Sequence, residues 1–383
     1  MKTIPEKITD SIIRNTITLD RFAEGINVEI TKVLIKAQNE IAGAIAEINP
    51  HAPLRTEWRT TRYQKLHKRI SDILNTAYEK AKKETNSNLE GMINPLVKKT
   101  IKDFNEAIGV DIFDVTLTPE FLKSIVTKTM IDGKIIGDWW DKQQEDTKIR
   151  IQEKINLARQ ELEVGLVQGE SITELISRVR KKEMSFKLDA PSIAKPDAMD
   201  ISKNEADALV RTSMMQVAQN VRMEIYKQNQ DILNGYEVIA TLDKRTTPLC
   251  RALDKKRFDL NFRPIGHDVP YPPRGFPAHW RCRSTLIPIT KSYQELMNND
   301  SLPETKKNLL KDIPAGKRSS MGGEASASMD YNEWLKTQPE EIQQEVLGIT
   351  RQKLWKENKL TMADMLHQNG RQLTLDELIK MLR

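Results

Sequence analysis

Cysteines and long apolar runs are both scarce in this sequence of 383 residues. Its two cysteines exclude a disulfide scaffold and fit a reducing cytosol, or a particle assembled there. No segment approaches the roughly 18 uninterrupted apolar residues of a membrane span. Residues 1–20 lack both the apolar run and the small-residue cleavage site of a secretory signal. We therefore expect neither a signal peptide nor a membrane span.

The commonest catalytic motifs are absent as well. The sequence contains no phosphate-binding GxxxxGK[ST], no HExxH and no GxSxG. These absences set aside the P-loop nucleotide enzymes, the zinc metalloproteases and the serine hydrolases with a nucleophile elbow. We expect that the protein is not an enzyme, with one Cys/His pair as the exception to be weighed.

Helical periodicity dominates the chain from residue 6 to about 235, with apolar residues three or four apart and charges between them. One stripe ends before Gly169, and Ser171 with Glu174 forms a capping box for the next helix. Another long helix is predicted over 203–233. The apolar positions of these two helices are Ile151, Ile155, Ala158, Leu162 and Leu166, and then Ala208, Val210, Met214, Val217, Val221 and Ile225.

Breaks in this pattern predict the boundaries. Proline residues at 49–53 separate a first long helix from a second, and Pro119 opens another after a turn or short strand at 109–121. The stretches 184–200 and 312–330 have connector composition. The expected fold is mainly α: an elongated region of long helices, a small α+β module near the C-terminal third, and a tail of short helices. The expected parts are 1–130, 131–235, 236–290, a linker at 291–330, and 331–383.

A Cys/His segment between residues 235 and 290 has a different character. The residues from Gly235 onward are β-branched enough for a strand, and 284–290 could pair with it. Thr247 followed by Pro248 is typical of an N-cap and first turn, which predicts a short helix with Cys250 in that turn. The positive end of the helix dipole there favours a thiolate.

Three interpretations of this segment are open. Cys250, His279 and Cys282 could bind zinc, since thiolate and imidazole ligands suit that ion, with His267 or Asp254 as the fourth ligand. Cys250 could instead be a nucleophile with His279 as its base, although no orienting third group is evident. In the third interpretation the thiols and the histidine only pack a compact loop.

Positive charge is concentrated in the same segment. Residues 241–290 hold ten Lys or Arg and four Asp, a net +6 that equals the formal charge of the whole chain. Such a concentration of cations could contact DNA phosphates without recognising the base sequence, or it could be only a solvated surface. The residues predicted to contact DNA are Arg251, Lys255, Lys256, Arg257, Arg281 and Arg283.

Four stretches together resemble the minor head, or head morphogenesis, proteins of tailed phages similar to phage Mu protein F. They are ALVRTSMMQVAQNVRMEIYKQN at 208–229, the block around Cys250, PPRGFPAHWRCRSTLIP, and YNEWLKTQPEEIQQEVLG in the tail. The resemblance covers about 135–383. The family segment commonly reads H-x-x-C-R-C, whereas Ser284 follows Cys282-Arg283 here, so a site built entirely from cysteines is not implied.

This resemblance implies a structural virion component inside the phage head, assembled in the host cytoplasm. Its expected partners are the portal protein, a capsid or scaffolding protein, and double-stranded DNA contacted non-specifically. Two alternatives remain: an enzyme delivered with the genome that uses Cys250 and His279, or a pure assembly adaptor without DNA contact.

Overall fold

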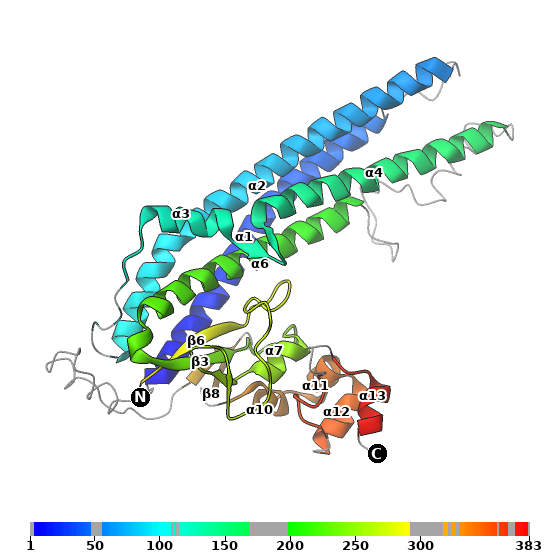
Figure 1. Ribbon diagram of the computed structural model, residues 1–383. Coiled ribbons are helices and arrows are strands. Elements are labelled where there is room, and N and C mark those ends of the chain that lie inside the picture. The colour runs from blue at the N-terminus through cyan, green and yellow to red at the C-terminus, as the bar shows by residue number, and fades with distance from the viewer. Residues whose placement is uncertain are drawn as a thin grey trace. The chain divides into compact units, whose positions relative to one another are not determined.

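The computed structural model describes residues 4–46, 56–108, 111, 113, 115–167, 198–291, 317–320, 323–326, 329–357, 360–366 and 372–381. Long helices dominate these residues, as the periodicity predicts (Figure 1). No helix among them is both long and apolar enough to cross a membrane. The long helices and the shorter one after Pro119 are α1 (Ile4–Ala46), α2 (Thr56–Ile108), α3 (Pro119–Lys128), α4 (Ile136–Val167) and α6 (Ala198–Gln228).

These residues pack as two compact units, each built from separate stretches of sequence. One comprises 1–23, 89–132 and 211–383, and the other comprises 24–88 and 133–210. Helices α1, α2 and α6 each contribute to both units, because a helix of this length extends past a single core. The five linear parts predicted above therefore describe sequence character and do not coincide with these packing units.

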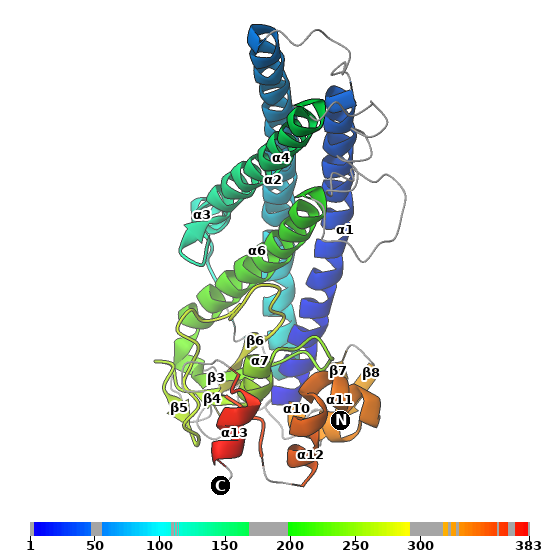
Figure 2. The same cartoon turned by 90° about the vertical axis from the view of Figure 1, so that its right-hand side faces the viewer.

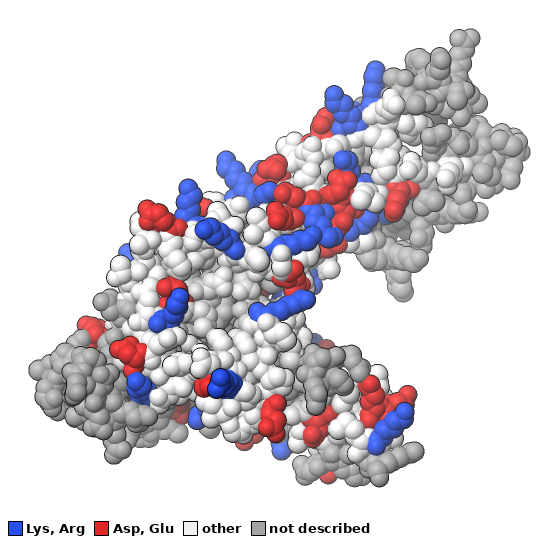
Figure 3. All heavy atoms as spheres, viewed as in Figure 1, with Lys and Arg blue, Asp and Glu red and all other residues white. Residues whose placement is uncertain are grey.

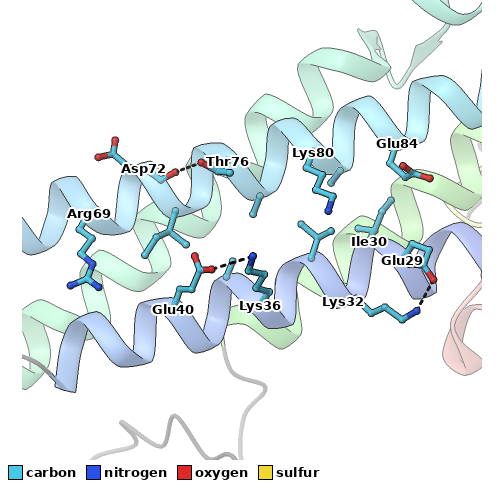
Figure 4. Close-up of a pocket in the computed structure, with 15 residues that line it drawn as sticks. Glu29, Ile30, Lys32, Lys36, Glu40, Arg69, Asp72, Thr76, Lys80 and Glu84 are labelled. Carbon is cyan, nitrogen blue, oxygen red and sulfur yellow. Dashed lines mark hydrogen bonds and ion pairs between the residues drawn. The ribbon is translucent and has the colours of Figure 1, made fainter.

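The unit formed by 24–88 and 133–210 is helical apart from the short β2. In α1, Ile26, Ile30, Leu34, Ala37 and Ile41 recur every three or four residues and are all buried, which produces a continuous apolar face. A groove of about 680 Å³ lies between α1 and α2. Figure 4 shows ion pairs such as Lys36 with Glu40 at its edge.

Buried polar contacts join α2, α4 and α6 within this unit. The Tyr78 hydroxyl lies 2.7 Å from Thr147 Oγ1, which lies 2.7 Å from Ser202 Oγ. Trp140 is fully buried, and its ring meets that of Tyr78 edge to face at 6.2 Å. Trp140 thus anchors the start of α4 in the core of this unit.

The other unit contains a four-stranded sheet in the order β5-β4-β3-β6. Strand β3 pairs antiparallel with the edge strand β6, with Tyr236 opposite Pro288, which confirms the predicted pairing of these segments. The short 3-10 helix η1 (Gln230–Ile232) separates α6 from β3, so the helix ends five residues before the predicted 233. The strands are β3 (Leu233–Ile239), β4 (Arg257–Phe258), β5 (Pro264–Ile265) and β6 (Thr285–Thr290).

The C-terminal tail forms short helices with a core of their own. Tyr331, Trp334 and Trp355 are buried together with Leu242 from the segment after β3. Gly348, at φ 78°, separates α11 from α12 because glycine tolerates this left-handed backbone. The two views agree that α10 and α11 lie beside α7 (Pro248–Leu253) (Figures 1 and 2). The helices are α10 (Tyr331–Lys336), α11 (Glu340–Leu347), α12 (Ile349–Lys356) and α13 (Leu375–Met381).

Some predictions differ from the structure, and others concern residues outside the described ranges. The capping box at Ser171 and Glu174, the stop at Gly169 and most of the 184–200 connector are outside them, although 198–200 already belong to α6. The predicted 312–330 connector contains the paired strands β7 (Lys317–Ser320) and β8 (Gly323–Ser326). The remaining short strands are β1 (Met130–Ile131) and β2 (Lys134–Ile135).

Candidate functional site

The first arm of the Cys/His cluster is the short helix α7 (Pro248–Leu253). Thr247 is its N-cap with extended backbone and Pro248 is its first residue, which places Cys250 in the first turn as predicted. The Thr247 side chain makes no capping hydrogen bond. Its Oγ1 lies instead 2.9 Å from His279 Nε2. The N-cap hydroxyl is therefore directed toward the cluster and not toward the helix.

The second arm is the loop that carries His279 and Cys282. The Cys282 N–H donates to the His279 carbonyl at 3.1 Å, which closes a tight turn. Between them Arg281 adopts a left-handed backbone at φ 59°, and its N–H donates to Thr212 Oγ1 of α6 at 2.9 Å. This turn, held against α6, brings the imidazole and the second thiol to the same side of the loop.

The three predicted residues converge on one point. Cys250 Sγ lies 3.2 Å from His279 Nε2 and 3.7 Å from Cys282 Sγ. All three candidate ligand atoms lie within 4.8 Å of one another. The two free cysteines are 1% and 0% exposed, and the histidine is half-buried. The cluster is thus a compact, largely dehydrated group of two sulphur atoms and one nitrogen.

Hydrogen bonding determines which histidine nitrogen faces the sulphurs. His279 Nδ1 lies 2.8 Å from the Trp280 carbonyl oxygen, which can only accept, so Nδ1 carries the hydrogen and donates it. In the neutral ring Nε2 then presents its lone pair to the thiols. Metal-binding histidines commonly show this arrangement, with one nitrogen hydrogen-bonded to a carbonyl and the other free for the metal.

Burial and hydrogen bonding separate the two thiols. Burial raises the pKa of Cys282, but its contacts with the Cys250 thiol and with the His279 ring in its protonated form more than offset burial, so the pKa lies well below its ordinary value. The pKa of Cys250 is raised by its hydrogen bond with Cys282 and by burial. Between the two thiols the lowered pKa thus falls on Cys282 and not on Cys250, the position at which the helix dipole predicts a thiolate.

Neither predicted fourth ligand joins the cluster. Asp254 Oδ1 accepts the Ala240 N–H at 2.7 Å and so ties the end of α7 to the segment after β3. His267 Nε2 lies 2.8 Å from the Arg257 carbonyl. The side chains that do reach the cluster are those of Thr247 and Ser284, which hydrogen-bond to Cys250. Sequence reasoning noted Thr247 only as a helix cap and Ser284 only as a departure from the family pattern.

The same geometry bears on the catalytic interpretation. A Cys/His nucleophile needs a sulphur that a substrate can reach and a group that orients the imidazole. Both sulphurs are buried, and the His279 ring is oriented by a backbone carbonyl; among the described residues no carboxylate is found hydrogen-bonded to it. The arrangement suits ligation or packing better than attack on a substrate.

Two of the predicted DNA-contacting arginines are engaged inside the protein. Arg251 is 7% exposed, donates to the Thr246 and Val346 carbonyls, and lies over the Tyr331 ring. The Arg283 side chain is 9% exposed and forms a two-pronged ion pair with Asp243. We therefore remove both from the proposed DNA-contacting set.

The remaining cations of the module differ in how they are engaged. Lys255 and Arg257 both pair with Glu237, at 3.0 Å and 2.9 Å, although the Arg257 side chain stays 60% exposed. Arg281 is exposed and Lys256 half-buried. Arg263, which was not in the predicted set, is exposed beside β5. Arg257 and Arg263 thus give the β4–β5 hairpin exposed positive charge, and Arg281 adds an exposed cation on the loop before β6.

Comparison with known proteins places this site in a family. Residues 156–287 match the family model described as Phage Mu protein F like protein, about a third of the chain. The chain therefore contains a Mu F-like region, and that region includes Cys250, His279 and Cys282. The resemblance inferred from the sequence is confirmed, and it suggests a phage head morphogenesis protein. The tail motif at 331–348 lies beyond the matched residues. No curated protein and no solved structure matches the chain.

Proposed function

We propose that this protein is a structural minor head protein of a tailed phage that acts as an assembly adaptor inside the procapsid. The Mu F-like match over 156–287 carries the proposal. On this proposal the chain assembles in the host cytoplasm with the portal protein and with capsid or scaffolding protein. It then remains as a component of the virion.

The surface of the long helices supports an adaptor role. Figure 3 shows Lys and Arg interspersed with Asp and Glu along them, a mixed surface that carries no extended block of one sign on this face. Several of these charges pair along a single helix, such as Lys32 with Glu29 and Lys99 with Asp103. Exposed ion pairs of this kind contribute little to the free energy of unfolding. Their side chains can therefore pair with a partner protein instead without much loss of stability.

Particle composition tests the adaptor proposal directly. We expect the full-length chain in purified procapsids and virions, and its co-purification with portal protein from cells that lack major capsid protein. Quantitative mass spectrometry of particles measures the first and affinity purification of tagged portal protein the second. Absence from assembled particles contradicts the head assignment; presence without portal binding contradicts only the portal partner.

DNA contact is expected to be weak and confined to the β4–β5 hairpin. Arg251 and Arg283 are engaged internally, and within the hairpin region Lys256, Arg257 and Arg263 are the proposed phosphate contacts. Three contacts predict a slope of log affinity against log salt of about −3. A fluorescence-anisotropy titration of the full chain on random duplex DNA measures that slope, and replacing all three residues by glutamine should abolish it.

A matched loss of charge elsewhere is the control. Replacing Lys32, Lys36 and Lys102 by glutamine removes the same charge from exposed helical positions. This variant should keep the salt slope of the parent. Equal loss in both triple variants would show only a general charge effect, and salt-independent binding would rule out phosphate contact.

A further inference from the structure

We propose that Cys250, His279 and Cys282 bind one zinc ion that pins α7 to the loop before β6. This inference is independent of the head-assembly role. It rests on the convergence of three ligand atoms from two arms of the chain within 4.8 Å.

The distances between the ligand atoms fit a tetrahedral ion. Zinc–sulphur bonds of about 2.3 Å and zinc–nitrogen bonds of about 2.0 Å place two sulphurs about 3.8 Å apart, and sulphur and nitrogen about 3.6 Å apart. The observed separations are 3.7 Å between the sulphurs and 3.2 Å from Cys250 Sγ to His279 Nε2. Both separations lie within a few tenths of an ångström of the tetrahedral values, and all three ligand atoms lie within 4.8 Å of one another.

The donor set favours zinc over other common ions. Two thiolates and one imidazole are soft or borderline ligands, which calcium and magnesium do not prefer. The Trp280 carbonyl holds the His279 ring so that Nε2 points to the sulphurs. Zinc-binding histidines commonly have this hydrogen bond from the ring nitrogen that does not bind the metal.

The fourth coordination position faces hydroxyl groups. The Thr247 hydroxyl lies 2.9 Å from His279 Nε2, and Ser284, two residues after Cys282, is 6% exposed. Neutral hydroxyls are poor zinc ligands but readily hold a bound water. The site therefore supplies three protein ligands and leaves the fourth position to water, and Ser284→Cys would supply a third sulphur as the fourth ligand.

The ion would have a structural role, because the two segments that supply its ligands contact different parts of the fold. On one side, Arg251 of α7 reaches the Val346 carbonyl of α11. On the other, the loop is held to α6 through Thr212 and continues into β6. Zinc would thus join α6, the sheet and the tail helices at one point.

Metal analysis of the full-length protein tests the proposal. We expect about one zinc per chain by mass spectrometry after purification without added metal. Replacing the bound metal by Co²⁺ should produce the sulphur-to-cobalt charge-transfer and the intense visible bands of a tetrahedral thiolate site. A zinc content near zero, together with no such bands on Co²⁺ titration of folded protein, overturns the proposal.

Variants identify the ligands. Cys282→Ser and His279→Ala should lower zinc content to a tenth or less, whereas His267→Ala, a histidine outside the cluster, should retain it. Ser284→Cys should tighten zinc binding at least tenfold in competition with a chelator and add a third sulphur to the cobalt spectrum. If Cys282→Ser does not fold, the cobalt spectrum of the wild type and the zinc affinity of Ser284→Cys still test the assigned ligands. Unchanged zinc in His279→Ala, or weaker binding in Ser284→Cys, contradicts the assigned ligands.

Discussion

Replacing Asp243 by asparagine is expected to lower the free energy of unfolding by about 3–5 kcal/mol, because it leaves a buried arginine unpaired. Asp243 accepts both terminal nitrogens of Arg283, and the two side chains are only 11% and 9% exposed. Its carboxylate also accepts the Arg245 N–H at 3.0 Å, and its own carbonyl accepts the Tyr331 hydroxyl at 2.8 Å. Urea unfolding followed by circular dichroism measures the loss.

The double variant separates the ion pair from simple packing. Asp243→Asn combined with Arg283→Met removes both charges and should be more stable than Asp243→Asn alone, since no buried charge is left without a partner. A single-variant loss below about 1 kcal/mol would show that the pair is not buried in solution.

Acidic pH should remove the stabilisation that the Asp243 carboxylate provides. Burial raises the pKa of Asp243, but Arg283 outweighs burial, so the pKa lies below its ordinary 3.8. A lowered pKa in the folded state means that the carboxylate stabilises fully above the ordinary value and loses its contribution as the pH falls through the folded value. The stability difference between wild type and Asp243→Asn should therefore be constant near neutral pH and shrink below about pH 4. A difference that shrinks only at alkaline pH would contradict this assignment.

Replacing Gly235 by alanine is expected to cost about 3 kcal/mol or more, through a clash that the backbone cannot relieve. Gly235 lies in β3 beside a bulge and has φ 154°. A Cβ there would meet the Phe258 carbonyl oxygen at 2.2 Å, in the strand paired with β3. Strand β3 would separate from β4. Thermal and urea unfolding should both measure the resulting loss of stability.

Gly266→Ala is the matched control for this substitution. Gly266 also has a positive φ, 73°, but no atom lies within 4 Å of a Cβ at that position. Its loss should be limited to the backbone strain of about 1–2 kcal/mol. Equal losses in the two variants would attribute the Gly235 effect to backbone strain alone.

Local patterns in the sequence predicted most of the regular structure. Proline at Pro119 and Pro248 starts a helix where expected, because its fixed φ suits the first turn. The residues of α6 from Val210 to Ile225 that were predicted to be apolar contacts are buried, and Ala208 is half-buried. The short strands β4 and β5 escaped prediction, since two residues carry no period and their pairing depends on contacts distant in sequence.

By itself the sequence determined the helical character, the β3–β6 pair and the residue types of the Cys/His cluster, because periodicity, turn residues and ligand chemistry are local properties. Only the tertiary structure decided which partners those side chains meet. It turned Thr247 from a helix cap into a neighbour of His279, and placed the lower-pKa thiol at Cys282. It also placed Arg251 and Arg283 among carbonyls and a carboxylate. The net charge of a segment cannot reveal such pairing, because an arginine in a sequence looks the same whether it faces solvent or a buried aspartate.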